Sequence, residues 1–155
     1  MPANLASQVA VVTGASKGIG KAIAQQLCGQ GMTVVLLART QSELDLAVAA
    51  MDDLVGQAVG ISCDITSEDQ VIKVFKDIDQ CFVRVDLLVN NAGIGFGDLI
   101  NDMSLVTWQA IIDVNLTGAF LCCREAFKRM EAGAGGRIIN IGSIAAVSPR
   151  PGASA

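Results

Sequence analysis

The stretch QVAVVTGASKGIG, residues 8–20, places a short apolar run directly before a glycine-rich turn and the start of a helical pattern. An uninterrupted β-branched run of this kind is typical of a strand that is buried on both faces of a parallel sheet. After the turn, Ile19, Ile23 and Leu27 recur at helical spacing. A strand, a glycine-rich turn and a helix in this order can hold a phosphate, because backbone N–H groups at the helix N-terminus point toward the anion.

Three glycines shape this turn: Gly14, Gly18 and Gly20, in the spacing G-x-x-x-G-x-G. The spacing differs from the G-x-G-x-x-G fingerprint of the commoner dinucleotide-binding folds. Its position between the first strand and the first helix nevertheless favours a nucleotide site. The alternative is a tight turn that binds no ligand.

Strand and helix patterns alternate along the rest of the chain, with short connections between them. This alternation predicts an α/β fold: a Rossmann-like, doubly wound parallel sheet of about five strands, with helices on both faces and right-handed crossovers. The expected strands are residues 8–13, 32–38, 58–62, 86–90 and 137–141. The expected helices are one that ends at Gly31, one over 41–54, one that Thr66 or Ser67 caps and that continues to Phe82, and two stretches between 105 and 130.

The composition limits the classes of protein that fit. A length of 155 residues predicts a single domain over residues 1–155. Lys and Arg number 11 and Asp and Glu number 15, and the resulting net charge of −4 argues against a nucleic-acid or anionic-membrane partner. Hydrophobic residues make up 52% of the chain, which excludes disorder. The longest uncharged stretch, residues 22–38, is broken by glutamines and glycines, so it is not expected to span a membrane.

The sequence contains no histidine, which excludes Ser-His-Asp and Cys-His catalysis and His-bearing metal sites within it. No metal site is expected. The five cysteines show no C-x-x-C spacing, as is typical of reduced thiols. Residues 1–8 lack the basic and apolar regions of a signal peptide, so a cytoplasmic protein is expected.

Five motifs together resemble the short-chain dehydrogenase/reductase family, and they cover essentially the whole chain. Each lies in the family's order and on the element where the family has it. The segment from Trp108 to Ile144 is most similar to the 3-oxoacyl-carrier-protein reductase branch. The motifs are TGASKGIG at 13–20, Asp64, NNAG at 90–93, Asn115 and Ser143.

By this resemblance, the turn and the carboxyl ends of the first four strands bind a nicotinamide dinucleotide. Asn90 is expected to tie neighbouring strands together, Asp64 to contact the adenine, and Ser143 to donate a hydrogen bond to the substrate carbonyl oxygen. Asparagine is a poor helix former, so the position of Asn115 within a helix indicates a purpose such as holding a bound water. The residues themselves leave two alternatives: Asp64 can cap the following helix, and Ser143 can be a turn residue. The expected catalytic residues are thus Ser143 and Asn115, and the expected cofactor-binding residues are Gly14, Ser16, Lys17, Gly18, Ile19, Gly20, Arg39, Asp64, Ile65, Asn91, Ala92 and Gly93.

The end of the second expected strand indicates which cofactor is preferred. Folds that prefer NAD place an acid there to bind the ribose 2′-hydroxyl, but residues 37–40 read LART and contain no carboxylate. Arg39 can instead bind a 2′-phosphate through its forked guanidinium, and Lys17 supplies a second cation. We therefore expect NADP(H), with NAD(H) less favoured. The alternatives are a solvated arginine at a strand end and a solubilising lysine in a loop.

The family also carries a Tyr-x-x-x-Lys element beyond the serine, in which the lysine lowers the pKa of the tyrosine that donates the proton. This sequence has no tyrosine and ends at Ala155. We therefore expect a C-terminally incomplete, truncated domain whose isolated activity is doubtful. Ile138, Ile139 and Ile141 would then lie on an unpaired edge strand, and the chain alone would be marginally stable, oligomeric or aggregation-prone.

The first hypothesis for function is an oxidoreductase that transfers hydride between NADP(H) and a small-molecule carbonyl, alcohol or acyl-thioester substrate, as a homo-oligomer when full length. The second is a catalytically inactive NADP-binding module or truncated isoform. A scaffold with a vestigial pocket is a third, and it leaves Lys17, Arg39 and Asp64 without a role.

Overall fold

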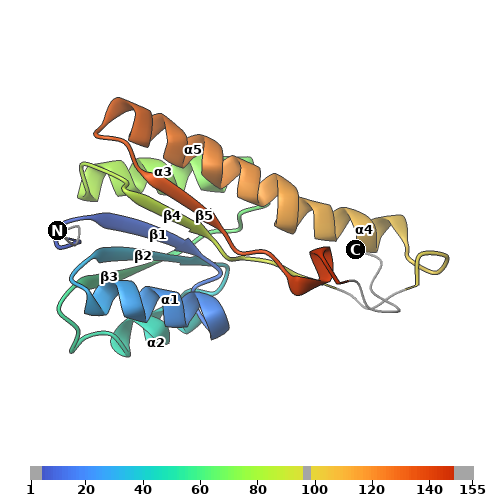
Figure 1. Cartoon of the computed structure of the whole chain (residues 1–155), viewed down its shortest axis with the longest axis horizontal. Coiled ribbons are helices and arrows are strands. Elements are labelled where there is room, and N and C mark those ends of the chain that lie inside the picture. Colours follow the sequence, from blue (N-terminus) through green and yellow to red (C-terminus); the bar gives the residue numbers. More distant parts are fainter. Residues whose placement is uncertain (1–4, 96–98, 149–155) are drawn as a thin grey trace.

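The computed structural model describes residues 5–95 and 99–148 and confirms the predicted α/β fold (Figure 1). Five strands form one parallel sheet in the order β3-β2-β1-β4-β5. Residues 1–4, 96–98 and 149–155 lie outside the described residues. The strands are β1 (Val9–Thr13), β2 (Thr33–Ala38), β3 (Gln57–Ser62), β4 (Leu87–Asn90) and β5 (Arg137–Asn140).

Helices cover both faces of the sheet, because the chain runs outward in one direction from β1 to β3 and in the other direction from β4 to β5. Two helices, α1 and α2, lie on one face, and α3 and α5 lie on the other (Figure 1). The helices are α1 (Gly18–Gly29), α2 (Gln41–Ala49), α3 (Glu68–Cys81), α4 (Leu105–Ile112), the π turn η1 (Asp113–Gly118), α5 (Ala119–Ala132) and the short η2 (Ile144–Ala146).

Successive residues of the central strand β1 belong to two separate apolar cores. Val9 and Val11 pack on the side of α3 and α5, where Phe75 is fully buried. Ala10 and Val12 pack on the side of α1 and α2. This alternation follows from the two-residue period of a strand, and burial on both sides explains why the run is apolar throughout.

Residues 105–132 form one continuous helical segment in which η1 joins α4 to α5, whereas the sequence pattern predicted two stretches. Ile112 and Ala119, which flank the π turn, keep helical backbone angles, so the wider turn does not break the helix. By length and composition alone this 28-residue segment could cross a membrane. Here one face of it packs on the sheet through Leu121, Cys122 and Ala126, and 22% of its most apolar window is buried.

Helix α2 ends at Ala49, five residues earlier than the pattern predicted. The chain has to turn there, because Gly56 donates its N–H to the Cys28 carbonyl at 2.8 Å and so lies directly against the end of α1. A Cβ on Gly56 would overlap the carbonyl oxygens of Met32 and Cys28. Met51, which the pattern placed on the helix, is still buried, but it lies in the turn.

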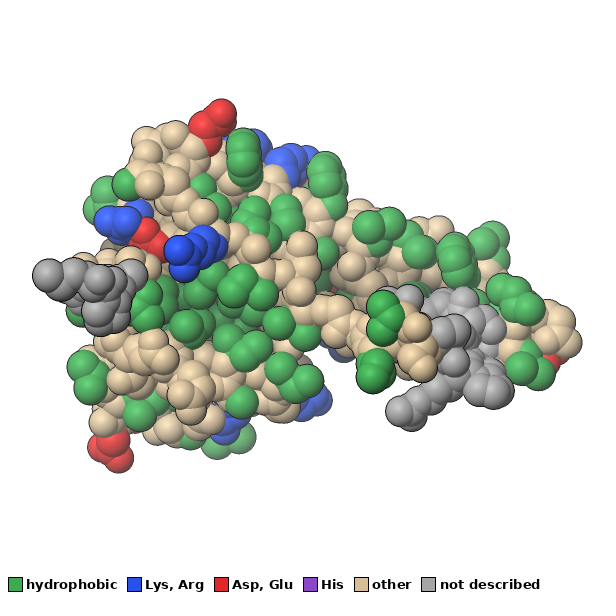
Figure 2. All heavy atoms as spheres, in the orientation of Figure 1, with side chains coloured by type: hydrophobic (Ala, Val, Ile, Leu, Met, Phe, Trp, Pro, Cys, Tyr) green, Lys and Arg blue, Asp and Glu red, His purple; other side chains and the backbone are tan. Residues whose placement is uncertain are grey.

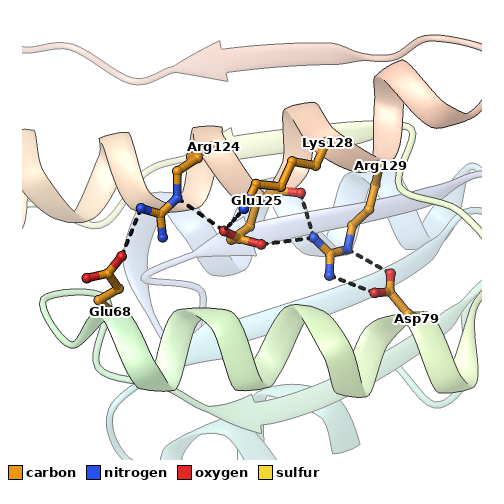
Figure 3. Close-up of polar contacts among 6 residues, drawn as sticks. All are labelled: Glu68, Asp79, Arg124, Glu125, Lys128 and Arg129. Carbon is orange, nitrogen blue, oxygen red and sulfur yellow. Dashed lines mark hydrogen bonds and ion pairs between the residues drawn. The ribbon is translucent and has the colours of Figure 1, made fainter.

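Charged side chains join α5 to both ends of α3 (Figure 3). Arg129 forms two hydrogen bonds to Asp79, at 2.6 and 2.7 Å. At the other end, Arg124 Nη1 lies 2.8 Å from Glu68 Oε1. Between them, the buried carboxylate of Glu125 receives hydrogen bonds from the neighbouring cations, Arg124, Lys128 and Arg129.

The edge strand β5 is only partly covered. Ile139 is 46% exposed and Ile141 is 41% exposed, while Ile138 packs against the core beside α5. Figure 2 shows hydrophobic side chains gathered over this side of the molecule. The apolar edge agrees with the sequence expectation, and the marginal stability or association expected from it stays a prediction.

Candidate cofactor site

A cavity of about 660 Å³ opens at the carboxyl ends of the first four strands. Strands β1 and β4 are neighbours, but the connections that leave them run in opposite directions, to β2 and to β5. Open α/β sheets bind their ligands at this reversal of strand order. The volume lies within the range of cofactor and small-molecule sites, roughly 300–1,000 Å³.

The turn after β1 leaves the N-terminus of α1 without a cap. Lys17, the N-cap residue, is extended (φ −155°) and makes no capping hydrogen bond, and the first turn of the helix contains no acidic residue. Gly14 and Gly18 have φ values of +63° and +57°, a conformation that glycine adopts without strain. The free N–H groups and the helix dipole together favour an anion at this turn.

The segment after β4 holds this turn in place. Asn91 Nδ2 donates to the backbone oxygens of Thr13 at 3.0 Å and Gly14 at 3.2 Å. The N–H groups of Asn91 and Ala92 both donate to Thr13 Oγ1 at 3.0 Å. A Cβ on Gly14 would lie 2.9 Å from Ala92 Cα, and a Cβ on Gly20 would overlap the Gly14 carbonyl oxygen. Glycine is therefore required at both positions by close approach of the backbone.

Asn90 ties neighbouring strands together, as expected from the family resemblance. Its Nδ2 donates to Asn140 Oδ1 at 2.9 Å, which joins the ends of β4 and β5, and lies 3.1 Å from Cys123 Sγ. Among the described residues, its own Oδ1 is buried without a hydrogen-bond partner.

Two basic side chains, Lys17 and Arg39, line the cavity together with the acidic side chain of Glu43. Ser16 Oγ donates to Glu43 Oε2 at 2.9 Å, and Lys17 Nζ lies 3.6 Å from Glu43 Oε1. The Lys17 side chain is 81% exposed, so this ion pair is weak. Arg39 directly follows β2 and lines the same cavity, and its guanidinium has no partner within residues 5–95 and 99–148.

Asp64 lies after β3 and lines the cavity. Its Oδ1 accepts hydrogen bonds from Thr66, from the backbone N–H at 3.0 Å and from the hydroxyl at 2.8 Å. Ser67, and not Asp64, caps α3, since Ser67 Oγ accepts from Gln70 N–H. Burial raises the pKa of the neighbouring Cys63 thiol to about 11, with the negative charge of Asp64 adding to the effect, so this thiol stays protonated.

Asn115 lies in the π turn η1 and has a structural partner. Its Oδ1 accepts from the Ile94 N–H at 2.9 Å, and its Nδ2 donates to the Ile94 carbonyl at 2.8 Å. Both polar groups of its side chain therefore hold the loop that follows β4, and this accounts for an asparagine at a poor helix position. Single π turns inside helices occur frequently at functional sites.

Ser143 is exposed after β5 and caps η2, because its Oγ accepts from the Ala145 N–H at 3.1 Å. This is the turn role that the sequence left open. The hydroxyl proton remains available for donation, since only a lone pair of the oxygen is used.

Nine of the twelve predicted cofactor-binding residues line the cavity, and Gly18, Ile19 and Gly20 form the adjoining first turn of α1. Neither Asn115 nor Ser143 lines it. The sequence reasoning missed Glu43, whose acidic position in the first turn of α2 was the available signal. It also missed lining residues from the helical segment after β4, namely Ala110, Asp113 and Val114.

The residues present fit the dinucleotide that the resemblance implies. The uncapped N-terminus of α1 provides N–H donors for a phosphate, and the free guanidinium of Arg39 provides a second anion-binding group. A Cβ on Gly18 would meet no atom within 4 Å, so this side of the turn is open. Among the described residues, no group of three or more Cys, Asp or Glu side chains is placed to hold a metal ion.

Comparison with known proteins identifies what the chain is similar to. Residues 8–155 match the family model of the short chain dehydrogenases. The chain is 44% identical over 149 residues to a 3-oxoacyl-(acyl-carrier-protein) reductase of Synechocystis sp., and this match covers 96% of the chain and 60% of the reductase. The chain thus spans less than two thirds of that relative's length.

Two solved structures show the same fold. A metagenomic short-chain oxidoreductase in complex with NADP is 38% identical, with a TM-score of 0.92 over 98% of this chain and 69% of that one. An NAD⁺-bound xylitol dehydrogenase is 31% identical, also with a TM-score of 0.92, over 97% of this chain and 58% of that one. Neighbours of this fold therefore include both an NADP complex and an NAD⁺ complex.

Proposed function

The chain belongs to the short-chain dehydrogenase family, and from that premise we propose that it forms the cofactor site of an NADP(H)-dependent oxidoreductase. The observation that carries the proposal is a pair of cations that line the cavity. Arg39 directly follows β2, and Lys17 lies at the uncapped N-terminus of α1. No carboxylate follows β2 directly to accept the ribose 2′-hydroxyl of NAD(H). A 2′-phosphate would instead pair with the free guanidinium of Arg39.

The bound cofactor supplies hydride chemistry, and the chain's residues hold it in place. The first-turn N–H groups of α1 would bind the dinucleotide phosphates, and Asp64 would contact the adenine end. Asn115 fixes the loop after β4, where Asn91, Ala92 and Gly93 border the cavity. Ser143 would donate its hydroxyl proton in a hydrogen bond to the substrate carbonyl oxygen.

The proposed substrate class is a small-molecule carbonyl or alcohol. An acyl-thioester is the specific form supported by the similarity to the Synechocystis reductase. The exposed apolar side chains of the 105–132 segment, including Leu116, Phe120 and Phe127, support a homo-oligomer. The proposed location is the cytoplasm. One face of the same segment packs on the sheet, as in the core helix of a soluble protein.

Titration with NADPH and NADH tests the cofactor preference directly, because nicotinamide fluorescence reports binding without turnover. We expect the chain to bind NADPH more tightly, and we expect Arg39→Asp to weaken NADPH binding at least 10-fold with little effect on NADH. Lys76→Asp is the matched control, since it makes the same charge change on an exposed position of α3, away from the cavity.

Equal affinity of the unmodified chain for the two cofactors would refute the NADP(H) preference. A parallel assay with a generic ketone separates enzyme from binding module. Consumption of NADPH supports the oxidoreductase, whereas fluorescence enhancement without consumption supports an inactive NADP-binding module. Absence of any enhancement would favour a scaffold without a cofactor.

A further inference from the structure

The anion-binding end of the cavity already contains an anion that belongs to the chain. Glu43, in the first turn of α2, accepts a hydrogen bond from Ser16 Oγ at 2.9 Å. Its other carboxylate oxygen lies 3.6 Å from Lys17 Nζ. The side chain is partly exposed and lines the cavity together with Arg39 and Thr40. The Glu43 carboxylate therefore already contacts the side chains of Ser16 and Lys17, which belong to the turn proposed to bind the phosphate.

We propose that Glu43 is a specificity-determining residue that competes with the cofactor's 2′-phosphate for Ser16 and Lys17. The inference rests on the proposed function, because it concerns the same cavity and the same cofactor. A phosphate that pairs with Arg39 and Lys17 has to share the lysine with Glu43 or displace it. It also comes close to a like charge, which costs free energy.

The competition acts on only one of the two cofactors. NAD(H) has an uncharged 2′-hydroxyl, which can donate a hydrogen bond to a carboxylate and has no charge to be repelled. NADP(H) has a phosphate dianion at the same position. Glu43 therefore reduces the difference in affinity between NADP(H) and NAD(H) that Arg39 and Lys17 create, without abolishing it.

The structure also limits the size of the effect. The Glu43 side chain is 44% exposed and the Lys17 side chain 81% exposed, so water and salt screen the charges strongly. When the 2′-phosphate displaces Glu43, the ion pair with Lys17 and the hydrogen bond from Ser16 are lost. At such an exposed site these two contacts correspond to a change in affinity for the 2′-phosphorylated ligand of about 3- to 10-fold. The effect should shrink at high ionic strength, because it is electrostatic.

The experiment compares Glu43→Gln with Asp53→Asn in the same chain. Asp53 is exposed in the turn after α2 and does not line the cavity, so the control removes one negative charge at a distance. Each variant is titrated with 2′-phosphoadenosine 5′-phosphate and with adenosine 5′-phosphate by calorimetry, and with NADPH and NADH by fluorescence. The first pair of ligands isolates the phosphate from the nicotinamide.

The expected result is that Glu43→Gln binds both 2′-phosphorylated ligands about 3- to 10-fold more tightly, while its affinity for adenosine 5′-phosphate and NADH is unchanged or lower. Asp53→Asn should match the unmodified chain. The melting temperature of ligand-free Glu43→Gln should also stay close to that of the unmodified chain, because the lost contacts are exposed.

Weaker binding of the 2′-phosphorylated ligands to Glu43→Gln would overturn the inference, since Glu43 would then position Ser16 and Lys17 for the phosphate. An unchanged affinity would overturn it as well. In either case the proposed function stands if Arg39→Asp still loses NADPH selectively. If neither cofactor binds to any variant, the proposed function fails and the inference fails with it.

Discussion

Replacing Glu125 by glutamine tests whether the charged contacts between α3 and α5 stabilise the fold. Glu125 is 4% exposed and receives hydrogen bonds from Lys128 at 2.8 Å, Arg124 at 3.1 Å and Arg129 at 3.2 Å. The substitution keeps the size of the side chain and removes its charge. We expect Glu125→Gln to lower the free energy of unfolding by about 2 kcal/mol, the middle of the range for hydrogen bonds to charged groups.

The partners of Glu125 set this magnitude. Breaking a buried ion pair costs about 3–5 kcal/mol when it leaves an isolated charge in the interior. Here Arg129 keeps Asp79, Arg124 keeps Glu68, and the side chain of Lys128 is 59% exposed, so no cation is left unpaired and buried (Figure 3). The expected cost is therefore smaller than that of a fully buried pair.

Urea denaturation followed by circular dichroism measures the effect, and about 2 kcal/mol corresponds to a midpoint shift of about 1 M at the usual dependence of stability on urea. Glu131→Gln is the matched control, because Glu131 lies exposed on the same helix and should change stability by less than about 0.5 kcal/mol. Equal midpoints for the two variants would refute the stabilising role. A higher midpoint for Glu125→Gln would mean that the cost of burying the carboxylate exceeds its interactions.

The pH dependence provides a second readout of the same contacts. Burial alone would raise the pKa of Glu125, but hydrogen bonds from Lys128 and Arg129 and the nearby positive charge hold it below its ordinary value of 4.5. A group whose pKa is lowered by folding stabilises the fold above its unfolded pKa, and this stabilisation is lost as the pH falls through the folded value. The stability difference between the unmodified chain and Glu125→Gln should therefore be constant near neutral pH and shrink below about pH 4.5.

Two further predictions follow from glycine packing and thiol burial. Gly20→Ala should unfold at lower temperature and lose NADPH binding, because the new methyl group would overlap the turn after β1. Gly29→Ala should raise the free energy of unfolding by about 0.5–1 kcal/mol in thermal melts, because its new methyl group would meet no atom within 4 Å beyond its chain neighbours and its own helix backbone. A melting temperature of Gly20→Ala equal to that of the unmodified chain would contradict the close packing at Gly20. In the folded chain, a thiol reagent at pH 8 should modify the exposed Cys81 quickly and leave Cys63 and Cys122 unmodified. Burial raises the pKa of Cys63 to about 11 and that of Cys122 to about 12, so both thiols stay protonated at this pH. Rapid labelling of Cys63 or Cys122, detected by mass spectrometry, would contradict their burial.

The fold was predictable because its signals are local. The apolar runs at 8–13 and 32–38 require burial on both faces, and only a parallel sheet covered by helices provides that for both. The order of strands and helices then fixes the handedness of the crossovers. The boundary of α2 was not predictable, because it depends on contact between Gly56 and the end of α1, 28 residues away along the chain, which no periodicity reports.

The role of Asn115 shows the same limit at the site. Its poor helix propensity indicated a purpose, and a bound water was one suggestion. The structure shows that both polar groups of the side chain form hydrogen bonds to the backbone of Ile94. A side chain that bonds to a backbone elsewhere leaves no pattern in its own neighbourhood, so a sequence can indicate that an asparagine has a partner without indicating which one.

Glu43 is a charged residue of the cofactor cavity that lies outside the motif at residues 37–40. The expectation of NADP(H) rests on residues 37–40, where the missing acid and Arg39 both favour a 2′-phosphate, and on the cation of Lys17. Helix α2 starts only two residues after Arg39, so its first turn returns an acid to the same cavity, within hydrogen-bond distance of Ser16. The charges beside a proposed 2′-phosphate therefore include a competing anion, Glu43, as well as the cations Lys17 and Arg39. Cofactor preference in this cavity should accordingly depend on ionic strength and on Glu43 as well as on the residue at the end of β2.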